Sequence, residues 1–95
     1  MNTAIDSDDG NPVLRNKARA ALSGWRSRIA DLVRSGQQNG ELRKTIDPDS
    51  VATVMIAALE GAVMMGGLEK TRQPLHVVGK HLEKYLLSLR ASSKS

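Results

Sequence analysis

Residues 51–68 read VATVMIAALEGAVMMGGL, and only Thr53 and Glu60 in this stretch carry polar side chains. The stretch follows Asp47-Pro48-Asp49-Ser50, where an aspartate cap and a proline in the first turn indicate the start of a helix. A helix that is apolar around its whole circumference has to be buried on all sides. The sequence therefore predicts a central helix that other elements cover.

A first amphipathic helix is predicted from Asn11-Pro12 to about Gln38-Asn39, because asparagine is a good N-cap and proline is favoured at the first helical position. Gly40 follows and is able to take the left-handed conformation that ends many helices. Apolar residues recur along this segment at helical spacing, at Leu14, Ala18, Ala21, Leu22, Trp25, Ile29, Leu32 and Val33. We expect this stripe to cover one side of the central helix.

A third helix is predicted from Pro74 to Arg90, after a polar turn at residues 69–73. Its apolar residues alternate at spacings of three and four, and they are Leu75, Val78, Leu82, Tyr85 and Leu89, with Leu86 beside them. Between the first two helices, Leu42 and Ile46 are expected to contact the core from a short connector. The predicted fold is all-α, a three-helix antiparallel module.

The amino-acid composition limits the classes of protein to which this chain can belong. The chain has 95 residues, no cysteine and a net charge of +4 whose basic residues are spread along the sequence, which favours solubility more than nucleic-acid binding. Residues 1–10 are polar and acidic and lack the features of a signal peptide. We therefore predict a cytoplasmic protein with a disordered segment at 1–10, one helical domain at 11–90 and a frayed tail at 91–95.

Small residues form a row on the central helix, where Ala58, Ala62 and Gly66 are spaced by four and let another helix approach closely. One interpretation is that the row accepts the third helix of the same chain. The other is self-association, because the apolar face left over is large for a monomer. We predict self-association through this row together with the third helix, whose apolar stripe has the spacing of a bundle seam. The predicted interface residues are Met55, Ala58, Ala62, Met65, Gly66, Val78, Leu82, Tyr85, Leu86 and Leu89.

A membrane span is the other way to bury such a helix, since the run is close to the minimum length that crosses a bilayer. Glu60 lies at its centre, where a carboxylate is costly, and glycines interrupt it. We therefore predict no membrane association.

The order of several features resembles a known family. The run Trp25-x-x-x-Ile29-x-x-Leu32-Val33-x-x-Gly36-Gln37-x-x-Gly40-Glu41-Leu42 is followed by Ile46-Asp47-Pro48 and then by Leu59-Glu60-Gly61-Ala62. This combination, across residues 20–90, resembles the C-terminal domain of tetracycline-repressor-type (TetR-family) transcriptional regulators.

The resemblance implies a homodimer in which the last two helices of each chain form a four-helix bundle across the two copies. It also implies a C-terminal domain that binds a small, apolar effector. In that family an N-terminal helix-turn-helix domain binds DNA, and nothing before residue 11 of this chain is long enough to encode one. The resemblance therefore implies a fragment or truncated form that reaches DNA only through a missing N-terminal domain. A free-standing helical interaction module that homodimerises is the alternative function.

Three residues are candidates for effector contacts, each with a simpler alternative. Trp25 stacks on an effector or anchors the first helix to the core, and Met64 lines an adaptable pocket or belongs to the core. Glu60 contacts an effector, pairs with an arginine across the dimer, or lies on a solvent-exposed stripe of the helix. His76 and His81 are five residues apart, which does not suit joint metal ligation on a helix.

Patterns typical of catalysis are absent. The sequence has no Ser/His/acid pattern, no His-Glu-x-x-His and no glycine loop between a strand and a helix. We therefore predict that the chain is not an enzyme and takes neither a cofactor nor a metal.

Overall fold

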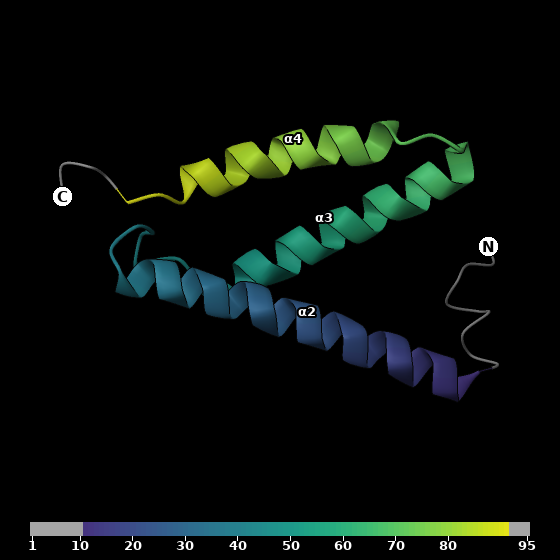
Figure 1. The fold of residues 1–95 in the computed structure, drawn as a ribbon, viewed down its shortest axis with the longest axis horizontal. Coiled ribbons are helices and arrows are strands. Elements are labelled where there is room, and N and C mark those ends of the chain that lie inside the picture. Colours follow the sequence, from purple (N-terminus) through teal and green to yellow (C-terminus); the bar gives the residue numbers. More distant parts are fainter. Residues whose placement is uncertain (1–10, 92–95) are drawn as a thin grey trace.

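The computed structural model describes residues 11–91, and within them the chain forms three α-helices, α2 (Pro12–Gln38), α3 (Pro48–Glu69) and α4 (Gln73–Ser88). In Figure 1, α3 runs between the other two, and α4 returns antiparallel to it. The all-α class and the order of the three helices are confirmed. The disorder predicted for residues 1–10 lies outside the described residues, and so does the frayed tail predicted for residues 91–95, apart from Ala91.

The predicted N-terminal signals act as expected in α2 and α3. The Asn11 side chain accepts a hydrogen bond from the Leu14 amide, and Pro12 occupies the first position of α2. The Asp47 carboxylate accepts bonds from the Asp49 amide at 3.4 Å and from the Ser50 hydroxyl at 2.7 Å. Both caps satisfy amides that a helix start leaves without an intrahelical partner.

The cap of α3 makes stability depend on pH. The pKa of the Asp47 carboxyl lies below its ordinary value, chiefly because the Ser50 hydroxyl donates to it. A carboxyl whose pKa is lowered by folding stabilises the fold above its unfolded pKa and loses this effect as pH falls through its folded pKa. We therefore expect Asp47→Ala to lower the urea midpoint at pH 7, and the difference from the unaltered chain to shrink below about pH 4.

Asp47→Asn is the matched control for this prediction, because asparagine caps helices about as well as aspartate but does not titrate. It should keep most of the pH 7 stability. Equal losses in the alanine and asparagine variants would contradict a capping role for this side chain.

The core lies at one end of the molecule, where all three helical segments meet. Its buried centre consists of Val33, Val51 and Leu89. The residues packed around this centre are Leu42, Ile46, Met55 and Tyr85. The predicted contacts of Leu42 and Ile46 with the core are thereby confirmed.

The last helix is shorter than predicted, ending at Ser88 rather than Arg90. The chain leaves the helix because its backbone pairs with the connector: the Arg43 amide donates to the Leu89 carbonyl at 3.0 Å, and the Ala91 amide donates to Glu41 at 2.9 Å. The Arg43 guanidinium also donates to the Ser88 carbonyl at 3.1 Å. These bonds join residues far apart in the sequence, so helical periodicity does not reveal them.

Among the described residues, α2 and α4 each run along α3, and the backbones of these two outer helices do not approach each other. The buried residues of α2 are Ala30, Val33 and Gly36, all near its C-terminal end. Its N-terminal half diverges from α3, so that the two helices form an open V (Figure 1). Val13 and Leu14, at the open end, are exposed.

Candidate functional site

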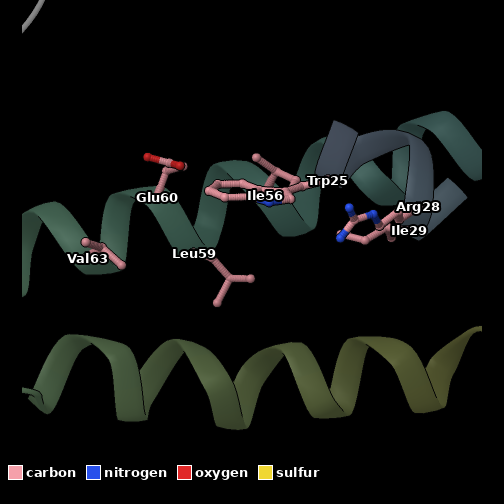
Figure 2. A pocket seen from close by; sticks show the side chains of 7 residues that line it. All are labelled: Trp25, Arg28, Ile29, Ile56, Leu59, Glu60 and Val63. Atoms are coloured by element: carbon pink, nitrogen blue, oxygen red, sulfur yellow. The ribbon is translucent and has the colours of Figure 1, made fainter. Parts of the chain in front are cut away.

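A cleft of about 500 Å³ lies between α2 and α3. It is lined by Trp25, Arg28 and Ile29 of α2 and by Ile56, Leu59, Glu60 and Val63 of α3. Figure 2 shows Glu60 on the side of α3 that is away from α4, while Leu59 points toward α4. The volume is within the range of small-molecule sites in proteins, about 300–1,000 Å³.

Helical spacing places these side chains together. Residues three or four apart share one side of a helix, so Trp25, Arg28 and Ile29 form one wall of the cleft. Ile56, Glu60 and Val63 form the other wall by the same spacing. Trp25 is 48% exposed and does not belong to the core cluster, so the alternative that it anchors α2 to the core does not hold within this chain.

Two charged groups stand at the edge of this apolar cleft, Arg28 and Glu60. Both residues are exposed. Within residues 11–91 neither side chain makes a salt bridge or hydrogen bond. The cleft thus presents an aromatic ring, aliphatic side chains and two ionic groups that are available to a ligand.

Two of the three predicted effector contacts, Trp25 and Glu60, line this cleft. Met64 does not line it and is 59% exposed, because its position on α3 turns it away from the cleft wall. The sequence interpretation missed Arg28, Ile29, Ile56, Leu59 and Val63. Their distances from Trp25 and Glu60 along the sequence, one to four residues, are the signal that identifies them.

The predicted dimer residues divide into three groups by burial. Ala62 and Leu89 are buried within their own chain, and Met65 and Leu86 are exposed. The half-buried members are Met55, Ala58, Gly66, Val78, Leu82 and Tyr85. Much of the small-residue row is therefore covered by this same chain, which was the alternative considered above, and self-association remains a prediction.

Gly66 has a role inside the chain. The Thr71 amide donates to the Gly66 carbonyl at 3.0 Å, and a Cβ at Gly66 would lie 2.7 Å from the Thr71 carbonyl oxygen. Lys70 takes a left-handed conformation with φ of 58° at this turn. The absence of a side chain at Gly66 thus permits the turn between α3 and α4.

A wide apolar surface of α3 is left exposed, at Val54, Val63, Met64, Met65 and Leu68. Met64 is 59% exposed, so the alternative that it belongs to the core does not hold within this chain. By length and composition α3 resembles a membrane-spanning helix, with a mean hydropathy of 1.8. This is weak support for a membrane span, because the central helices of soluble proteins pass the same test.

His76 and His81 are exposed, and residues 11–91 hold no group of three His, Cys, Asp or Glu side chains that could bind a metal ion.

The chain matches one protein family over most of its length. Residues 1–82 match the family described as tetracyclin repressor-like, C-terminal domain. The chain belongs to this family. Two crystal structures of TetR transcriptional regulators superpose on it with a TM-score of 0.84. The protein from Chloroflexus aurantiacus is 41% identical over 94% of this chain, and the one from Cytophaga hutchinsonii is 30% identical over 96%.

Curated relatives of this TetR-family chain are also regulators rather than enzymes. The transcriptional regulator AcuR of Cereibacter sphaeroides is 42% identical over 62 residues, which are 61% of this chain and 28% of AcuR. The HTH-type transcriptional repressor DhaR of a Mycobacterium species is 26% identical over 78% of this chain and 37% of its own length. The chain thus spans less than half the length of these relatives, and 46% of each solved structure.

Proposed function

We propose that this TetR-family chain is the dimerisation and ligand-sensing part of a transcriptional regulator, with the cleft between α2 and α3 as its effector site. The observation that carries the proposal is that Trp25 and Glu60, from two helices, line one cleft of about 500 Å³. The effector is a small, largely apolar molecule, because most lining side chains are aliphatic or aromatic.

The walls of the cleft also suit a signalling role. The fully buried residues of α2 lie near its C-terminal end, and the cleft lies between α2 and α3, so a ligand in the cleft contacts both helices. A ligand that binds one angle between the helices better than another shifts the population toward that angle. In a longer regulator, DNA binding belongs to the N-terminal domain, and the chain described here acts in the cytoplasm without catalysing a reaction.

The cleft is tested with toluene as a small apolar probe. Trp25 is the only tryptophan in the chain, so its indole N–H gives a single, assignable NMR signal. We expect toluene to shift this signal to saturation. Val63→Arg should weaken binding by about tenfold or more, because Val63 is 62% exposed on the cleft wall and a guanidinium there fills apolar space.

Val77→Arg is the matched control, since Val77 is an exposed valine of α4 outside the cleft. It should leave the toluene affinity unchanged. Equal affinities in the two variants, or no shift in the unaltered chain, would contradict an effector site in this cleft.

Light scattering at micromolar concentration tests the dimer, and a monomeric mass at high concentration would contradict that part of the proposal.

A further inference from the structure

The cleft between α2 and α3 holds two opposite charges that have no partner inside the chain. Arg28 stands on the α2 wall and Glu60 on the α3 wall. Both side chains are exposed, and within residues 11–91 neither makes an ion pair or a hydrogen bond. Glu60 is also the only charged residue of α3 between Asp49 and Glu69. Ion pairing within the described part of the chain therefore does not account for either charge.

Helical geometry places Arg28 at the outer edge of the α2 wall. Successive residues of a helix are rotated by about 100°. A rotation that starts at the buried Val33 passes Ile29 after about 40° and Trp25 after about 80°. It reaches Arg28 after about 140°. Arg28 thus lies beyond the indole of Trp25, away from the buried side of α2.

The same geometry places Glu60 at the outer edge of the α3 wall. A rotation that starts at the buried Ala62 passes Leu59 and then Ile56, and it reaches Glu60 after about 160°. Figure 2 shows Leu59 pointing toward α4 and Glu60 pointing away from it.

The two charges are separated by apolar side chains. In Figure 2 the indole of Trp25 lies between the Arg28 guanidinium and the Glu60 carboxylate. The half-buried Ile29, Ile56 and Leu59 complete the apolar floor between them. A ligand that covers this floor therefore has one end near a cation and the other end near an anion.

This order of groups selects among ligands by their charge. An uncharged apolar molecule on the floor displaces water from both ionic groups and replaces none of its hydrogen bonds. A molecule with a single charge pairs with one group and leaves the other unpaired. A molecule with opposite charges at its two ends pairs with both, and like charges exclude the reversed orientation.

We propose that the effector of this cleft is a zwitterion with an apolar middle, whose carboxylate pairs with Arg28 and whose ammonium group pairs with Glu60. The inference rests on the proposed effector site and names the class of ligand that the site takes. Amino acids whose two charged groups are separated by a ring or a short hydrocarbon chain belong to this class.

Four probes of similar shape test the inference through the indole N–H signal of Trp25. They are p-xylene, which is neutral, 4-methylbenzoate, which is an anion, 4-methylbenzylammonium, which is a cation, and 4-(aminomethyl)benzoate, which is a zwitterion. An exposed ion pair contributes about threefold in affinity. The zwitterion should therefore bind about tenfold more tightly than p-xylene, and more tightly than either singly charged probe.

Removing one charge at a time identifies the partner of each end. Arg28→Gln should weaken binding of the zwitterion and of 4-methylbenzoate by about threefold and should not weaken binding of the cation. Glu60→Gln should weaken binding of the zwitterion and of the cation and should not weaken binding of 4-methylbenzoate. Affinity for p-xylene should not fall in either variant.

Arg26→Gln and Glu69→Gln are the matched controls, because they remove the same charges from exposed residues of the same two helices outside the cleft. Both should keep the affinity for the zwitterion, and circular dichroism should show equal helicity in all variants. If p-xylene binds and the zwitterion binds no more tightly, or if Arg28→Gln and Glu60→Gln leave its affinity unchanged, the zwitterion is wrong and the apolar effector site stands. If none of the four probes shifts the indole signal, the effector site itself is wrong.

Discussion

Ala62→Glu is expected to unfold this chain rather than only to separate two copies of it. Ala62 is 1% exposed in the single chain, so a carboxylate at this position loses its water. The described part of the chain buries no charged or polar residue, so position 62 has no buried cation to pair with a new carboxylate. An unpaired buried charge costs several kcal/mol, which is comparable to the ~5–15 kcal/mol that stabilises a small domain.

Urea unfolding followed by circular dichroism measures this effect. Ala57→Glu is the matched control, because Ala57 lies on the same helix but is exposed. It should change the free energy of unfolding by about 0.5 kcal/mol or less. A cooperative transition of Ala62→Glu at the unaltered midpoint would show that Ala62 is not packed against its own chain.

Gly36→Ala has the second largest expected effect, although it adds a single methyl group. Gly36 is buried in α2, and a Cβ there would lie 2.7 Å from Cδ1 and 2.9 Å from Cγ of Leu42. Leu42 cannot withdraw freely, because it packs against the core and its amide donates to the Gly36 carbonyl at 3.1 Å. Overpacking of this kind costs about 1–3 kcal/mol.

Gly24→Ala is the control in the same helix, since a Cβ at Gly24 meets nothing within 4 Å. Alanine has the higher helix propensity, so this variant should gain up to ~1 kcal/mol. The two substitutions should thus move the urea midpoint in opposite directions. A gain in both variants would mean that the connector does not press against Gly36.

Local signals in the sequence predict the helices well. The starts of α2 and α3 depend on a capping side chain and a proline within three residues, and Asn11 and Asp47 make the expected bonds. Gly40 has a φ of 84°, as expected for the residue that ends the first helix. The exception is the end of α4, which depends on backbone bonds to residues 41–43.

The candidate site was predicted in part. Trp25 and Glu60 stood out in the sequence because an indole and a carboxylate are unusual on their helices. That they line one cleft depends on the packing of two helices whose residues are 35 positions apart, which no local pattern encodes. The Met64 side chain is also suited to contact an apolar effector, but it does not line the cleft.

Taken by itself, the sequence determined three helices, their starts and a central helix that needs neighbours, because caps, prolines and periodicity act within one or two turns. Only the tertiary structure decided which sides of α3 and α4 are covered. A helix that is apolar all round, such as residues 51–68, has no polar side to give it an orientation. Its orientation comes instead from where α2 and α4 pack against it, and this packing leaves the cleft between α2 and α3 open.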